Sequence, residues 1–218
     1  MGSNAVLALV QAGDVEGLRR VVERESGAAD TRDATGVSLL MHSLYCGRRD
    51  LAEVIASRKE VLDIFEAASL GRIDCIMKSL RGDPAAINAH SNDGFTALHF
   101  ACFFGRPEVA RLLIDSGAAV DAVSGNAMRV MPLHSAATTL NLEAVRILLE
   151  RGAPVNARQQ GGWVPIHAAA QNGDRAMVEL MLKHGADPKL ANDEGKTPAV
   201  IAREKGHEEI VALLEKHA

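Results

Sequence analysis

Three histidines stand at matching places along the chain, and their type and spacing could suit metal chemistry. His99, His134 and His167 are 35 and 33 residues apart, and each follows a Leu or an Ile. Imidazole nitrogens are common zinc ligands, and they must lie about 2 Å from the ion. Equivalent residues on stacked helices lie about 8–10 Å apart. These three side chains therefore cannot share one ion, and we predict no metal ligands.

Other signatures of catalysis are missing from the sequence. It contains no HExxH, CxxC or P-loop motif and no Gly-x-Gly-x-x-Gly after a strand. We therefore predict no catalytic residues and no cofactor, although an enzyme with an unrecognised site stays as an alternative. Cys46, Cys75 and Cys102 are odd in number and scattered within apolar segments. We expect buried or half-buried free thiols in a reducing cytoplasm, with a disulfide as the alternative.

Composition bounds the class of protein. The chain has 218 residues, of which 47% are hydrophobic and 24% charged, with a net charge of −4 and both signs interleaved. Binding nucleic acid needs a basic face to neutralise phosphates, and no such block is present. The apolar runs are shorter than the ~20 residues that cross a bilayer, and the N-terminus does not read as a signal peptide. We expect a cytoplasmic monomer that binds neither nucleic acid nor membrane.

The elements that position these residues repeat along the chain. Gly117-Ala118, Gly152-Ala153 and Gly185-Ala186 recur at the same spacings as the histidines. Each unit contains a turn, a short apolar helix, a glycine and a second apolar helix, such as VARLLIDSG, AVRILLERG or MVELMLKHG. A period near 33 with two helices per unit predicts a stacked array, because no unit can bury its apolar face alone.

The repeated motifs resemble those of ankyrin repeats. GFTALHFA, VMPLHSAA, VPIHAAA and KTPAVIA are similar to the family's Thr-Pro-Leu-His motif, and SGAAVDA, RGAPVNA and HGADPKL are similar to its Gly-Ala-Asp-Val-Asn close. The resemblance implies an all-α solenoid of stacked helix-turn-helix units with β-turn fingertips, as a single domain over residues 1–218. It also implies that the motif histidine ties neighbouring turns by hydrogen bonds. The expected units are diverged at 4–30, 33–58 and 61–89 and regular at 91–123, 124–157, 158–191 and 192–218.

Several units depart from this pattern. Between Ser57 and Asp63 the turn is nearly absent, so we expect a missing fingertip and a bend in the stack. Residues 124–130 carry two extra positions, which predicts a longer fingertip. Leu140 replaces an inter-helix glycine, with no visible compensation. Met131 and Val164 replace the capping Thr, at a cost of about 1 kcal/mol each unless another group caps the helix.

Asn156 lies in LLERGAPVNAR, which resembles the asparaginyl-hydroxylation sequence of many animal ankyrin repeats. The alternative is that this Asn stabilises its own turn through backbone hydrogen bonds.

Aromatic residues concentrate at positions that should face outward from the first helices. These positions are the residue before the capping site and the two before the inter-helix glycine. Of seven aromatics, five occupy them, whereas Phe65 and Phe100 should lie inside. An exposed apolar patch that is rich in aromatics is typical of an interaction site. The candidate partner-binding residues are Tyr45, Leu70, Phe95, Phe103, Phe104, Met128, Val130, Thr138, Trp163, Gln171, Asn172 and Lys196.

The sequence thus favours a non-catalytic protein–protein interaction module that binds an unidentified protein or peptide on a concave face. One alternative is a regulatory or inhibitory subunit of a specific enzyme. For the pair Phe103 and Phe104, we expect both rings to face outward. The alternatives for that pair are packing against Met128 or the missing fingertip, and self-association.

Overall fold

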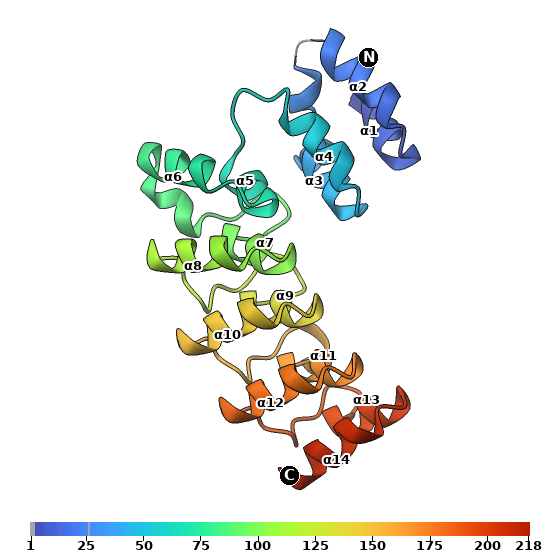
Figure 1. Cartoon of the computed structure of the whole chain (residues 1–218), viewed down its shortest axis with the longest axis vertical. Coiled ribbons are helices and arrows are strands. Elements are labelled where there is room, and N and C mark those ends of the chain that lie inside the picture. The colour runs from blue at the N-terminus through green and yellow to red at the C-terminus, as the bar shows by residue number, and fades with distance from the viewer. Residues whose placement is uncertain (1–2, 26) are drawn as a thin grey trace.

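The computed structural model describes residues 3–25 and 27–218 (Figure 1). Fourteen α-helices follow one another in pairs within these residues. The pairs are α1 (Ser3–Ala12) and α2 (Val15–Arg24), α3 (Leu39–Tyr45) and α4 (Arg49–Ala56), α5 (Ile64–Leu70) and α6 (Ile73–Gly82), α7 (Ala97–Phe103) and α8 (Pro107–Asp115), α9 (Pro132–Thr138) and α10 (Leu142–Glu150), α11 (Pro165–Gln171) and α12 (Arg175–Lys183), and α13 (Pro198–Glu204) and α14 (Glu208–Lys216).

Three short 3₁₀ helices, at Ala28–Asp30, Pro84–Asn88 and Gln160–Gly162, complete the helical structure of the described residues. One isolated β-bridge joins Arg32 and Ser38, and those residues contain no strand. The predicted all-α stack of helix pairs is confirmed. The division of residues 1–218 into seven units of one domain stays a prediction, and residues 1, 2 and 26 lie outside the described residues.

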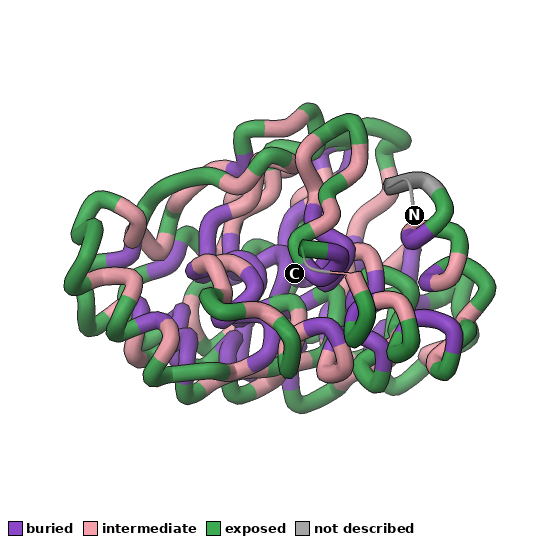
Figure 2. Tube along the Cα trace, turned by 90° about the horizontal axis from the view of Figure 1, so that it is seen from above, coloured by how far each residue is buried: buried purple, intermediate pink, exposed green. Residues whose placement is uncertain are grey.

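The pairs stack along the long axis of the molecule, with the N-terminus at one end and the C-terminus at the other (Figure 1). From α5 onward the first helices of the pairs form one row and the second helices form another. Fully buried side chains such as Leu98, Leu133 and Ile166 line the stack from unit to unit. Viewed along the stack, buried positions lie in the middle and exposed ones at the periphery (Figure 2). Each fully buried Leu or Ile stabilises the stack by about 1.5–3 kcal/mol.

Backbone hydrogen bonds join the fingertips of the C-terminal units. The N–H of Gly125 donates to the carbonyl of Gly94 at 2.7 Å, and that of Gln160 donates to Met128 at 2.9 Å. The N–H of Asp193 donates to Gly161, also at 2.9 Å. These bonds fix each fingertip on its neighbour. They join the fingertips between residues 91 and 197 into one hydrogen-bonded series beside the first helices.

The motif histidines also tie the units together, as predicted. Nε2 of His99 lies 3.0 Å from the carbonyl oxygen of Val130, Nε2 of His134 lies 2.9 Å from that of Ala157, and Nε2 of His167 lies 3.2 Å from that of Lys196. A carbonyl can only accept, so each Nε2 carries the proton and donates it to the next unit.

Nδ1 of each histidine serves the start of its own helix. It accepts from the backbone N–H of Thr96 at 3.2 Å, of Met131 at 3.0 Å and of Val164 at 3.0 Å. The lost Thr caps at Met131 and Val164 are therefore compensated in part, because the histidine binds the N–H at the helix start.

The fingertip between α4 and α5 is missing, as predicted. No turn hydrogen bond closes residues 58–62 in the described chain, and α5 begins directly at the cap residue Asp63. The two N-terminal pairs are offset sideways from the rest of the stack at this point (Figure 1). The predicted bend is therefore confirmed.

A buried ion pair holds this junction. Glu66 takes the place of the motif histidine, and one of its carboxylate oxygens accepts from the N–H of Asp63 at 3.2 Å. The other oxygen lies 3.2 Å from Nζ of Lys59, which also lies 2.9 Å from Asp30. The side chains of Glu66 and Lys59 are almost fully buried, so each supplies the counter-charge that the other needs.

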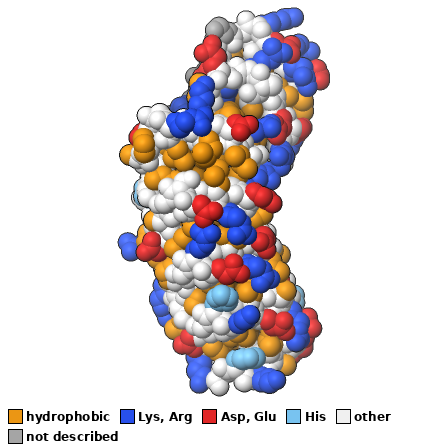
Figure 3. Space-filling view, turned by 60° about the vertical axis from the view of Figure 1, so that its left-hand side comes forward, with side chains coloured by type: hydrophobic (Ala, Val, Ile, Leu, Met, Phe, Trp, Pro, Cys, Tyr) orange, Lys and Arg blue, Asp and Glu red, His pale blue; other side chains and the backbone are white. Residues whose placement is uncertain are grey.

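The bend leaves apolar side chains uncovered on the outer side of α6. Ile73 is 43% exposed and Met77 37%. Hydrophobic side chains gather at the level of α6 on this side of the molecule (Figure 3). We name Ile73 and Met77, four residues apart on α6, the α6 patch.

Leu140 adopts a left-handed backbone conformation with φ = 58° and its side chain is 42% exposed. A residue with a Cβ atom is strained there by about 1–2 kcal/mol. We predict that Leu140→Gly is more stable than Leu140→Ala by about 1 kcal/mol, because glycine relieves the strain whereas alanine retains it. Urea unfolding of both variants measures the difference, and an alanine variant that is as stable as the glycine variant would contradict strain at this position.

Candidate functional site

Four of the predicted residues, Tyr45, Phe95, Phe103 and Met128, line one apolar cavity, and a fifth, Phe104, packs against the rings of Tyr45 and Phe103. Tyr45, Phe103 and Met128 are exposed large hydrophobic side chains, whereas Phe95 and Phe104 are half-buried. The cavity has a volume of about 220 Å³, and we name it the aromatic pocket. Its walls are Tyr45, Phe95, His99, Phe100, Phe103, Met128 and Ser135.

Ring packing orders this surface. The ring centroids of Phe103 and Phe104 lie 5.1 Å apart in an edge-to-face arrangement. Phe104 also stacks on Phe100 at 6.4 Å, and Phe95 meets Phe100 edge-to-face at 5.7 Å. Such pairs restrict each ring to few orientations. Phe103 therefore stands in a fixed position at the C-terminal end of α7, with one face toward the pocket.

The long fingertip supplies Met128. Its turn closes with a hydrogen bond from the N–H of Ser124 to the carbonyl of Val130, which confirms the predicted extra length. The side chain of Asn126 accepts from the N–H of Met128 at 3.1 Å, and the N–H of Gln160 donates to the Met128 carbonyl at 2.9 Å. The insertion is thus anchored on both sides and holds Met128 over the pocket.

Tyr45 reaches across a whole unit. Its ring stacks on Phe104 at 6.2 Å, although an entire helix pair separates them in the sequence, and its hydroxyl donates to the carboxylate of Asp93. Burial, together with the hydrogen bond to Asp93, raises the pKa of the Tyr45 phenol. The phenol therefore stays protonated and acts as the donor.

Leu70 is a correction to the predicted set. It is 3% exposed, and its neighbour Ser69 is fully buried. Both neighbouring units contact this end of α5, because the Ser69 hydroxyl donates to the sulfur of Met41 at 3.5 Å and the Ser69 carbonyl accepts from Nε of Arg106 at 3.0 Å. The expectation that Phe104 faces outward is wrong in part, because its ring packs on those of Tyr45, Phe100 and Phe103.

The remaining predicted residues do not join the aromatic pocket. Trp163 is half-buried and tilts against His167, with ring centroids 5.3 Å apart. A second cavity of about 200 Å³ is lined by Trp163, Thr138, Gln171 and Asn172, with other residues. Lys196 is in neither cavity, since its Nζ pairs with Glu204 at 3.0 Å and Glu194 at 3.4 Å. Val130 is half-buried at the base of the long fingertip.

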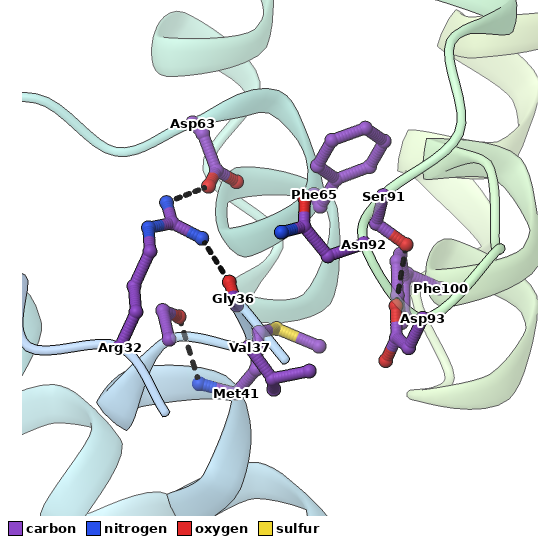
Figure 4. A pocket seen from close by; sticks show the side chains of 11 residues that line it. Arg32, Gly36, Val37, Met41, Asp63, Phe65, Ser91, Asn92, Asp93 and Phe100 are labelled. Atoms are coloured by element: carbon purple, nitrogen blue, oxygen red, sulfur yellow. Dashed lines mark hydrogen bonds and ion pairs between the residues drawn. The ribbon is translucent and has the colours of Figure 1, made fainter. Parts of the chain in front are cut away.

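A third cavity occupies the place of the missing fingertip (Figure 4). It was not predicted from the sequence. We name this cavity of about 200 Å³ the notch. Its lining includes Arg32, Val37, Met41, Asp63, Phe65, Ser91, Asn92, Asp93 and Phe100. The Asn92 amide spans the gap and donates to the carbonyl of Thr35 at 3.2 Å. The short segment Ser57–Asp63 could have predicted this cavity, because a missing turn leaves space between the neighbouring turns.

The cysteines and Asn156 have plain structural settings. All three cysteines are free; Cys102 is buried and Cys75 half-buried, as expected, but Cys46 is exposed. Burial raises the pKa of the Cys102 thiol. Asn156 bonds to the following unit and not to its own turn: Nδ2 donates to Gly185 at 2.9 Å, and Oδ1 accepts from Asp187 N–H at 2.9 Å. The side chain therefore links two units, and its modification stays a prediction.

Neither a membrane-spanning helix nor a metal-binding cluster is found among the described residues. In residues 3–25 and 27–218, no helix is both long and apolar enough to span a membrane. In the same residues, no group of three or more His, Cys, Asp or Glu side chains is placed to hold a metal ion.

A family model for ankyrin repeats (3 copies) matches residues 64–159 and 133–218. Curated relatives include the human BCL-6 corepressor-like protein 1, 37% identical over 87 residues, or 40% of this chain and 5% of that protein. The human B-cell lymphoma 3 protein is 36% identical over 123 residues, or 56% of this chain and 26% of that protein. A probable E3 ubiquitin-protein ligase, XBOS31 from Oryza sativa subsp. japonica, is 43% identical over 94 residues, or 43% and 21%. The chain thus spans about a quarter or less of the length of these three relatives.

Proposed function

We propose that this chain, which belongs to the ankyrin-repeat family, is a non-catalytic module that binds a partner protein or peptide on its concave face, at the aromatic pocket. Ankyrin repeats are generally protein–protein interaction modules, and the family is generally non-catalytic. The single observation that carries the proposal is an open apolar pocket of about 220 Å³. Four aromatic side chains, those of Tyr45, Phe95, Phe100 and Phe103, line it.

The pocket has the physical properties of a binding hot spot. Tyr45, Phe103 and Met128 expose apolar surface to water in the free protein, so covering them releases free energy of about 25 cal/mol per Å². Stacking on Phe104 and the hydrogen bond to Asp93 already fix Tyr45. A partner would therefore meet ordered rings and lose little side-chain entropy on binding. If the partner is an enzyme, the same contact makes the chain its regulatory subunit.

We predict that Phe103→Asp weakens partner binding by at least tenfold, because it places a carboxylate where an apolar side chain should dock. Ile73→Asp in the α6 patch is the matched control, since Ile73 is 43% and Phe103 41% exposed. Quantitative affinity capture from host-cell lysate compares the wild type with both variants. Mass spectrometry then identifies the proteins that each one retains.

We expect a protein that the wild type and Ile73→Asp capture and that Phe103→Asp does not capture. The reverse pattern would move the site to the α6 patch. Retention by both variants would contradict a binding role for either surface. Thermal unfolding of the two variants checks that each remains folded, which both exposed positions should allow.

A further inference from the structure

The notch beside the aromatic pocket carries a negative charge without a counter-ion. Asp93 forms no ion pair with any cation in the part of the chain that the structure describes. Its two carboxylate oxygens accept from neutral hydroxyls: Oδ1 from Ser91 at 2.5 Å and Oδ2 from Tyr45. These bonds orient the carboxylate but leave its charge uncompensated.

The cation nearest in the lining is already engaged. Arg32 pairs with Asp63 at 3.0 Å through Nη2, and its Nη1 donates to the carbonyl of Gly36 at 2.9 Å. In Figure 4 this arginine lies on the Asp63 side of the notch, and Asp93 lies on the opposite side beside Ser91. Among the charged side chains of the lining, two carboxylates thus face one guanidinium. The notch therefore favours a further positive charge near Asp93.

The notch adjoins the aromatic pocket. Phe100 lines both cavities, and the Tyr45–Asp93 hydrogen bond joins a wall of one to a wall of the other. The notch lining mixes apolar side chains, Phe65 and Met41 among them, with polar ones such as Asn92 and two serines. A carboxylate beside apolar side chains suits a Lys or Arg, whose methylene stem can lie on the apolar side chains while its cationic head meets the carboxylate.

We propose that the partner segment carries a basic residue next to its apolar anchor, so that the anchor fills the aromatic pocket while the Lys or Arg head pairs with Asp93 in the notch. This inference rests on the proposed function and adds the chemistry of the partner. An acidic residue would be repelled at Asp93, and a neutral one would leave the charge unpaired. The notch thereby selects among the many segments that offer an apolar side chain.

The probe is a phage-displayed library of random 12-residue peptides, selected on the immobilised full chain. We expect the enriched peptides to carry Lys or Arg within a few residues of a large apolar side chain. One enriched peptide is then synthesised and titrated against the wild type, Asp93→Asn and Asp74→Asn. Asparagine removes the charge and keeps one acceptor oxygen for the Tyr45 hydroxyl, while the Ser91 hydroxyl can still donate to the carbonyl of Phe95. Asp74 is an exposed carboxylate on α6 that serves as the matched control.

Asp93→Asn should weaken binding roughly tenfold, the effect of a charge-assisted hydrogen bond, whereas Asp74→Asn should leave it unchanged. Replacing the basic residue of the peptide by Gln should weaken its binding to the wild type by the same factor. The same replacement should not weaken its binding to Asp93→Asn any further, because the charge pair is already lost. Enriched peptides without basic residues, or equal binding by Asp93→Asn, would overturn the inference and leave the proposed function standing. No enrichment, or equal binding of the peptide by Phe103→Asp, would overturn the proposed function and this inference with it.

Discussion

Phe100→Ala is expected to lower the free energy of unfolding by about 3–5 kcal/mol, the range for removing a buried aromatic ring. Phe100 is 3% exposed and lies at the centre of an aromatic cluster. Its ring centroid is 5.7 Å from that of Phe95, 6.0 Å from that of Phe65 and 6.4 Å from that of Phe104. Phe65 belongs to α5 and the others to α7 or its fingertip, so the lost contacts join two helix pairs.

The position of Phe100 makes the loss local as well as large. In a stacked array each unit is stabilised chiefly by its neighbours, so a weakened contact between units can divide the unfolding transition. Phe100→Ala should therefore let the helices before α7 unfold at lower urea concentration than those after it. Urea titration followed by circular dichroism, together with hydrogen exchange resolved by segment, measures both effects.

Phe103→Ala is the matched control, because Phe103 is 41% exposed on the same helix. It should lose less than about 1 kcal/mol, since most of its ring is not in the core. Equal losses in the two variants would show that Phe103 belongs to the core and that the aromatic pocket is not a free surface.

Local pattern was enough to predict the stack and its main defect. The recurring Leu-His pairs gave the period, and the bonds of His99 to Val130 and of His134 to Ala157 are the ties that the family resemblance implied. The short Ser57–Asp63 segment indicated the missing fingertip. These features depend on residues within one unit or on its immediate neighbour, and a repeated sequence reports such contacts directly.

The outward positions were predicted less well, because they depend on units that are not adjacent. The repeat rule placed Leu70 on the surface and grouped Trp163 with the phenylalanines. Leu70 is buried, in the unit across which Tyr45 and Phe104 meet, and Trp163 lines a separate cavity. The hydrogen bond of Tyr45 to Asp93 spans a whole helix pair, the pair that lacks its fingertip. No rule that treats the units as equivalent could have found it.

Acidification from pH 7 to pH 5 is expected to destabilise the chain through the buried motif histidines. Burial is the main cause that lowers the pKa of His99 to about 4, and it also lowers the pKa values of His134 and His167. In the unfolded chain each histidine titrates near 6.5. Below that pH the unfolded state takes up a proton that the folded state does not, so stability falls with pH until the folded pKa is reached.

The geometry explains why the folded state resists this proton. Nδ1 of His99 already accepts from the N–H of Thr96, and Nε2–H donates to Val130. A proton on Nδ1 would face that N–H donor and break the cap. For a folded pKa near 4, His99 alone should cost about 1.6 kcal/mol between pH 6.5 and 5, with a slope of up to ~1.4 kcal/mol per pH unit.

Urea unfolding of the wild type, His99→Gln and His217→Gln at pH 7, 6 and 5 separates this effect from general acid sensitivity. The slope of the unfolding free energy against pH should fall by up to ~1.4 kcal/mol per unit in His99→Gln and stay unchanged in His217→Gln, whose histidine is exposed. Asp33 does not contribute to this slope between pH 7 and 5. Its hydrogen bonds, the one from the Thr35 hydroxyl first, lower its pKa. A carboxylate whose pKa is lowered on folding loses its stabilising contribution only below pH ~4. Identical slopes in all three proteins would contradict a lowered pKa of His99. The hydrogen bond of His99 to the next unit would then have to persist with the imidazole charged.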